Sequence, residues 1–204
     1  MKNYNDEYYI IEQDYSFEDN AAYPSESSSN FDYDYDELVL GTKPLKFHAE
    51  ISDVGDFKSS YIFLYDGPSF LVNTELKEKI DFGLYGSQFF PAIIVGEDQG
   101  VRDDFWVLNT YDMLDALDEN KSDVKTIPES VDGLSMSGSV LKYSLDFELL
   151  SSIPEEERLI FKMSNTSTEP VFVHEKIVSI FRKLSVQGVK FYKVSEYEFG
   201  DEFQ

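Results

Sequence analysis

The sequence predicts an α+β fold in which two main amphipathic helices pack against mostly antiparallel strands. Many short apolar runs are separated by turn signals, of which Asp66-Gly67-Pro68 is the clearest. Only two segments place their apolar side chains at helical spacing. Of the 204 residues, 42% are hydrophobic and 16% aromatic, which is enough for a packed core despite the high charge.

The strands are predicted wherever an apolar run ends at turn residues. We expect strands at Tyr8–Ile11, Pro44–Ile51, Tyr61–Tyr65, Phe70–Val72, Gln88–Val95, Asp103–Asn109, Val140–Leu150, Arg158–Met163 and Val189–Val194. A helical turn is predicted at Tyr111–Leu117. Trp106 shares a strand face with Leu108, and we expect it in the core rather than in a contact surface.

The two helices are predicted from capping residues and apolar periodicity. The first begins after Asn73 or Thr74 and runs to about Phe82. The second and stronger one runs from about His174 to Gln187, and Gly188 is predicted to end it. Each helix follows a short apolar strand, so the two segments resemble one another. The resemblance allows two small lobes with one helix each, although so short a match also arises by chance.

The net charge is −23, from 40 acidic residues against 17 basic ones. The excess is uneven: residues 1–40 hold eleven acids and one base, whereas residues 158–204 hold six acids and seven bases. Such a field repels nucleic acid and anionic membranes and attracts cationic partners. We therefore expect neither nucleic acid nor membrane as a partner, while acidity that only maintains solubility remains the simpler interpretation.

Cysteine is absent, so disulfides and thiolate chemistry are excluded. The N-terminal residues MKNYNDEYYIIEQ hold only a four-residue apolar run, shorter than the core of a signal peptide, and no stretch is apolar enough for a membrane span. We expect a cytosolic protein. Its predicted organisation is an N-terminal strand with an acidic, aromatic-rich loop or arm (1–44), an α+β domain (45–195) and an acidic tail (196–204).

No catalytic or metal-binding motif is recognisable. The two histidines, His48 and His174, are predicted in a strand and at a helix N-cap, and neither has a serine or carboxylate at a motif spacing. Asp32, Asp34 and Asp36 mimic the start of a calcium loop, but position six is Glu37 and position twelve is Lys43, so the match fails. We expect no cofactor and no metal.

Two acidic segments are the predicted partner-binding sites. Residues Asp32, Tyr33, Asp34, Tyr35, Asp36 and Glu37 combine carboxylates with rigid aromatic side chains inside the polar tract Gln13–Glu37. Glu97, Asp98, Asp103 and Asp104 crowd a second loop and the start of the following strand. The alternative interpretations are a solvated arm for the first set and the charged end of a hairpin for the second.

Several apolar motifs follow one another in a recognisable order. They are Phe90–Ile94, Phe105–Asn109, Asp115–Asp118 with Ser122, Ile160–Met163, and Val173–Gly188 followed by Val189–Phe191. This order resembles the immunity-protein domain family of bacterial polymorphic toxin and type VI secretion systems, over roughly residues 45–195. The resemblance supplies framework motifs and no binding residues, and the acidic insert at 13–37 is not part of the family pattern.

The resemblance implies a function by binding. A member of such a family is expected to neutralise a cognate toxin encoded by the adjacent gene, and an acidic inhibitor suits a toxin with a basic active site. The first alternative is a carboxylate-dependent hydrolase, which needs a pocket converging on two acids with perturbed pKa values. The second is an adaptor or structural subunit of a secretion or phage-like particle, which would oligomerise through an exposed sheet edge.

Overall fold

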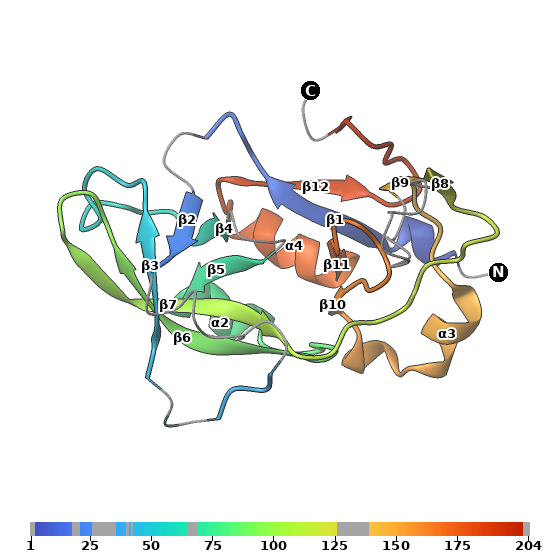
Figure 1. Cartoon of the computed structure of the whole chain (residues 1–204), viewed down its shortest axis with the longest axis horizontal. Coiled ribbons are helices and arrows are strands. Elements are labelled where there is room, and N and C mark those ends of the chain that lie inside the picture. Colours follow the sequence, from blue (N-terminus) through green and yellow to red (C-terminus); the bar gives the residue numbers. More distant parts are fainter. Residues whose placement is uncertain are drawn as a thin grey trace, which may run out of the picture.

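The computed structural model describes residues 3–17, 21–25, 36–39, 41, 43–64, 69–125 and 139–201. Strands dominate this part of the chain, and they form a barrel, a four-stranded sheet and a two-stranded ladder (Figure 1). The predicted α+β class is therefore confirmed in its broad form. No helix within these ranges is long and apolar enough to cross a membrane.

Six strands close into the barrel, in the order β2-β3-β6-β7-β5-β4. They are β2 (Ala21–Pro24), β3 (Leu45–Ala49), β4 (Tyr61–Leu64), β5 (Phe70–Asn73), β6 (Ser87–Val95) and β7 (Val101–Thr110). Four of the pairings are antiparallel, and two, β2 with β4 and β3 with β6, are parallel. The β6–β7 hairpin is the longest pairing and curves along one side of the barrel (Figure 1).

The four-stranded sheet is antiparallel and has the order β10-β11-β1-β12. Its strands are β1 (Tyr8–Gln13), β10 (Ile160–Lys162), β11 (Val171–His174) and β12 (Val189–Lys193). The N-terminal strand β1 thus lies between two strands from the end of the chain. The ladder pairs β8 (Asp123–Lys125) with β9 (Ser139–Lys142).

The α-helices in the described ranges are α2 (Thr74–Ile80), α3 (Phe147–Ser152) and α4 (Glu175–Lys183). Two short 3-10 helices, η1 (Tyr4–Asp6) and η2 (Glu155–Glu157), precede β1 and follow α3. Helices α2 and α4 contact each other between the barrel and the four-stranded sheet. Each follows a strand directly, so the two segments that resemble one another in sequence have the same strand-to-helix form.

Alternating side chains assign several of the strands to two cores, one on each face. In β1, Tyr9 and Ile11 face a core shared with α2, α4 and the outer side of the barrel, whereas Tyr8 and Ile10 face a second core under β9 and α3. In β5, Leu71 points into the barrel interior. Because both faces of β1 are buried, its sequence is continuously apolar from Tyr8 to Ile11.

Helix α4 ends earlier than its sequence predicts. Leu184 is the C-cap, and Ser185 takes a left-handed conformation with φ of 53°. Its N–H donates to the Arg182 carbonyl, and the Val186 N–H donates to the Phe181 carbonyl, which is the Schellman arrangement. The prediction that Gly188 ends this helix is therefore wrong; Gly188, with φ of 80°, precedes β12 instead.

Three other predicted elements are also wrong in part. Residues 111–117 form no helix, because the Leu114 backbone pairs with Lys162 and Ser164. The predicted strand Val140–Leu150 stops at Lys142, and Asp146 caps α3 by accepting from the Leu149 N–H. The polar tract Gln13–Glu37 contains β2, which pairs with β3 and β4 in the barrel.

The expected helices α2 and α4 are present, with Asn73 and His174 as side-chain caps. Trp106 is partly buried and packs against the core between barrel and sheet, where its Nε1–H donates to Thr74. The division into two lobes, and the boundaries at 44/45 and 195/196, stay predictions.

Truncating a β1 side chain tests the central position of this strand. Ile10 is 1% exposed, so Ile10→Ala should lower the free energy of unfolding by about 2–5 kcal/mol through lost burial and a cavity. The matched control is Val101→Ala on β7, because Val101 is 61% exposed and should cost less than about 1 kcal/mol. Urea unfolding measures both, and equal losses would contradict a buried central β1.

Candidate functional site

One end of the barrel gathers exposed carboxylates from two loops that are far apart in the sequence. The first loop is the turn 50–58 after β3, and the second is the tip of the β6–β7 hairpin, residues 96–104. Because β3 and β6 are parallel neighbours, with His48 opposite Val95, both chains leave the barrel at the same end (Figure 1). We call residues 50–58 and 96–104 together the acidic barrel end.

The two loops are bonded to each other. The Glu97 N–H donates to the Ile51 carbonyl at 3.0 Å, and the Arg102 Nη1 donates to the Phe57 carbonyl at 2.8 Å. Gly100 permits this close approach, since a Cβ there would lie 2.6 Å from Val54 Cγ1. The hairpin tip is therefore held against the turn.

Six carboxylates of the acidic barrel end are exposed: Glu50, Asp53, Asp56, Glu97, Asp98 and Asp103. Asp53 and Asp98 also stabilise their own loops by accepting from the N–H groups of Gly55 and Gly100. The nearby exposed cation is Lys58. The outward field at this end is therefore strongly negative.

Asp104 differs from its neighbours because it is paired within the chain. Arg102 donates from Nε and Nη2 to its two carboxylate oxygens, each at 2.6 Å. The hydrogen bond from Arg102 lowers the pKa of Asp104 below its ordinary value. Of the four predicted residues in this loop, Asp104 thus contributes least to the outward field, while Glu97, Asp98 and Asp103 lie exposed together.

Of the other predicted set, Asp32, Tyr33, Asp34 and Tyr35 lie outside the described residues. Asp36 and Glu37 are exposed. The segment that follows them is bound to β6, because the Gln88 side chain accepts from the Leu38 N–H and donates to the Leu38 carbonyl, both at 2.9 Å. Asn109 on β7 donates to the Asp36 carbonyl at 3.0 Å. Asp36 and Leu38 are therefore attached along the same hairpin that carries the second predicted set at its tip.

Sequence reasoning missed Asp53 and Asp56 as members of the site. They directly follow the predicted strand Pro44–Ile51, but only the parallel pairing of β3 with β6 brings them beside the hairpin tip. A local pattern carries no signal for such a pairing, because the partners are more than 40 positions apart.

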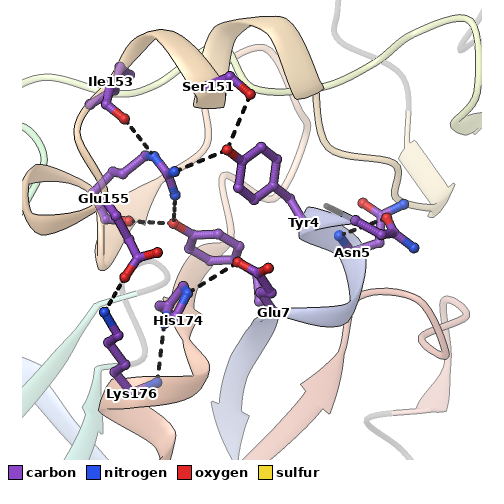
Figure 2. A network of polar contacts seen from close by, with 11 residues as sticks. Tyr4, Asn5, Glu7, Ser151, Ile153, Glu155, His174 and Lys176 are labelled. Atoms are coloured by element: carbon purple, nitrogen blue, oxygen red, sulfur yellow. Dashed lines mark hydrogen bonds and ion pairs between the residues drawn. The ribbon is translucent and has the colours of Figure 1, made fainter. Parts of the chain in front are cut away.

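A second group of polar side chains surrounds the buried Arg158 and connects α3, η2, η1 and α4 (Figure 2). Arg158, 2% exposed, donates to the Tyr8 hydroxyl at 2.5 Å, to the Tyr4 hydroxyl at 3.2 Å and to the Ile153 carbonyl at 3.0 Å. Its guanidinium also lies over the Tyr4 ring, 4.7 Å from the centroid. Burial raises the pKa of Tyr8 to about 12, so its hydroxyl stays protonated and donates to the Arg158 carbonyl.

His174, Glu7 and Glu155 lie close enough together to raise the question of a metal, with one ligand atom of each within 4.8 Å of the others. The geometry of the imidazole answers it. His174 Nδ1 accepts from the Lys176 N–H at 3.2 Å, so in the neutral ring the proton is on Nε2, which faces Glu7 at 3.5 Å. A protonated Nε2 has no lone pair for a metal, and Glu155 already binds the Lys176 ammonium (Figure 2). These residues fit a helix cap and do not fit a metal site.

Fold and geometry together define an α+β protein whose buried polar groups are used in packing and which carries one group of its exposed carboxylates at one end of a barrel. A model of the immunity protein family (Imm11) matches residues 65–196, more than half of the chain, and the chain belongs to this family. The family assigns it an immunity function against a toxin, and therefore a cognate toxin as partner and a non-enzymatic role. No curated protein matches the chain.

The motifs behind the predicted resemblance form a connected framework. Phe90 and Val107 are paired across β6 and β7, and Leu114 pairs with Met163. Asp118 and Ser122 of the third motif close a turn, since the Ser122 N–H donates to the Asp118 carbonyl at 2.9 Å. The matched residues thus build strands and turns, as expected of framework motifs.

The His174 cap predicts a pH dependence. Burial is the main cause that lowers the pKa of His174 below 6.5, so the unfolded chain binds this proton more readily than the folded one. Stability should therefore fall as pH decreases through about 6.5 toward the lowered value. Facing groups Glu7 and Glu155 oppose this shift, and Lys176 adds to it.

His174→Asn retains a capping oxygen but removes the group that titrates between about pH 7.5 and 5.5. In this variant the free energy of unfolding should therefore depend less on pH over that range. Urea unfolding at several pH values across this range measures the free energy of unfolding, and His48→Asn is the control for an exposed histidine. An unchanged slope in His174→Asn would show that other groups cause the dependence.

Proposed function

We propose that the chain binds and neutralises a cognate antibacterial toxin, with the acidic barrel end as the contact surface. Membership of the immunity protein family is the observation that carries the proposal. The proposal includes a basic toxin encoded by the adjacent gene, its action in the cytosol, and protection of the producing cell and its kin.

The physical argument for this surface is electrostatic. Exposed carboxylates such as Glu97 and Asp103 project a negative field that steers a cationic partner toward the barrel end. In contact, they would stand in for the phosphates of an anionic substrate and occlude a basic active site. The two bonded loops hold these groups in place, so little ordering entropy is lost on binding.

The hydrolase alternative receives no support from the carboxyl groups that the structure describes. A carboxyl acting as general acid needs a raised pKa. The carboxyl groups with a resolved shift, Asp14, Asp104 and Asp118, all have lowered pKa values, with hydrogen bonds from neighbouring side chains as the main cause.

Removing charge from the hairpin tip tests the proposed surface. The triple change Glu97→Gln, Asp98→Asn and Asp103→Asn should slow association with the adjacent gene product by about fivefold or more at low salt, with a smaller effect on dissociation. Because exposed charges are screened over about 8 Å at physiological ionic strength, the difference should shrink in about 0.5 M salt. Binding kinetics measured by biosensor give both rates.

The matched control removes three exposed carboxylates elsewhere, at Glu75, Glu78 and Glu156. It changes the net charge equally, so an equal slowing in both triples would assign the effect to net charge and overturn the barrel end as the contact surface.

A separate prediction concerns the acidic aromatic segment, residues 32–37. Changing both Tyr33 and Tyr35 to Ala should speed dissociation, at a cost of roughly 1–3 kcal/mol of binding free energy for each tyrosine that contacts the toxin. Replacing Asp32, Asp34, Asp36 and Glu37 by Asn or Gln should instead mainly slow association. Melting temperatures serve as the control. Unchanged kinetics in both sets would exclude this segment from the interface, and a large drop in melting temperature would assign it a structural role.

A further inference from the structure

A hollow of about 590 Å³ lies beside η1 and α3, at the opposite end of the molecule from the acidic barrel end (Figure 1). Three segments border it: η1, the turn 118–121 after β7, and the first turn of α3. The segments are joined by hydrogen bonds, since Asn5 accepts from the Leu145 N–H at 2.8 Å and the Asp118 N–H donates to the Ser144 carbonyl at 2.8 Å. We call it the η1 hollow.

The charges that line the η1 hollow favour a cation. Asp118, Asp146 and Glu148 face a single base, Lys121. Asp146 also accepts from the Leu149 N–H at the start of α3, so this donor is not available to an anion. A phosphate or carboxylate ligand would meet uncompensated negative charge here.

One ammonium group of the chain itself, that of Lys121, already lies against these carboxylates. Lys121 Nζ lies 2.5 Å from Asp118 Oδ2, and the hydrogen bond to Asp118 raises the pKa of Lys121, with smaller contributions from Asp146 and Glu148. The ammonium neutralises Asp118 and leaves the charge of Glu148, which is exposed and has no ion-pair partner among the described residues. The hollow therefore retains a carboxylate for a second cation.

An aromatic wall distinguishes the hollow from a merely acidic surface. The Tyr4 and Phe147 rings lie 5.5 Å apart and are tilted by 31°. Tyr4 already carries a guanidinium, that of Arg158, on its ring. Phe147 is 37% exposed, so part of its ring is accessible from solvent beside Glu148.

We infer that the η1 hollow takes one arginine side chain of the partner toxin, as a second contact separate from the acidic barrel end. A flat guanidinium stacks on an aromatic ring and donates two parallel hydrogen bonds to one carboxylate, whereas an ammonium does neither. Phe147 supplies the ring and Glu148 the carboxylate. The side-chain amides of Asn3, Asn5 and Asn120 at the rim can accept from the remaining N–H groups.

The inference rests on the proposed function for its partner, but the chemistry of the hollow can be tested on the full chain alone. N-acetyl-arginine amide is titrated while the side-chain amide signals of Asn3, Asn5 and Asn120 are followed by NMR. Saturable shifts at these amides in the millimolar range are expected. N-acetyl-citrulline amide, which has the same shape without the charge, should leave them unchanged, and N-acetyl-lysine amide should bind more weakly.

Two exposed substitutions make the test specific. Glu148→Gln and Phe147→Leu should each weaken the binding of N-acetyl-arginine amide by about three- to fivefold, while Glu78→Gln on α2 should have no effect. Melting temperatures confirm that the variants are folded. Equal shifts with arginine and citrulline, or unchanged affinity in both hollow variants, would overturn the inference.

Binding of the adjacent gene product then identifies the occupant. Glu148→Gln combined with Phe147→Leu should weaken toxin affinity by about tenfold, mainly through faster dissociation. Unchanged toxin affinity would overturn the inference and leave the proposed function intact. A chain that binds N-acetyl-arginine amide but not the adjacent gene product would instead contradict the proposed function.

Discussion

The insertion of β1 between β11 and β12 is the constraint on which the rest of the structure depends. A strand near residue 10 pairs on one side with residues 172–174 and on the other with residues 189–193. Both of its faces are buried, in two different hydrophobic cores. Without β1, the backbone groups of both neighbours would lose their partners and the two cores would open together.

The same strand helps to explain the buried polar network. Tyr8, on β1, is one of the groups that satisfy the Arg158 guanidinium, and Tyr4, just before β1, is another. A buried guanidinium is costly unless its donors are paired, so the position of β1 and the loop from α3 to β10 determine each other. His174, at the other end of this network, caps α4 and thereby joins the helix to the sheet.

Residues outside the family match complete both surfaces that carry the functional argument. The match begins at residue 65, so β1, β2, β3 and β4 all precede it. The acidic barrel end combines the 50–58 turn with the matched hairpin tip, and the η1 hollow combines Asn3–Asn5 with matched residues from 118 to 148. Under the proposed function, N-terminal residues outside the match would therefore contribute to partner binding beside the matched framework.

The sequence by itself determined the α+β class, the strands of the sheet, the strands of the barrel except β2, and the beginnings of α2 and α4. These follow from apolar periodicity and from capping residues such as Asn73 and His174. It also singled out Glu97, Asp98 and Asp103 as an exposed acidic group. Only the tertiary structure decided that Asp53 and Asp56 join them, that Asp104 is neutralised by Arg102, and that residues 111–117 form no helix while 147–152 do. The physical reason is that these features depend on strand pairings and contacts between residues distant in the sequence, or on a local competition between extended and helical backbone that such contacts settle.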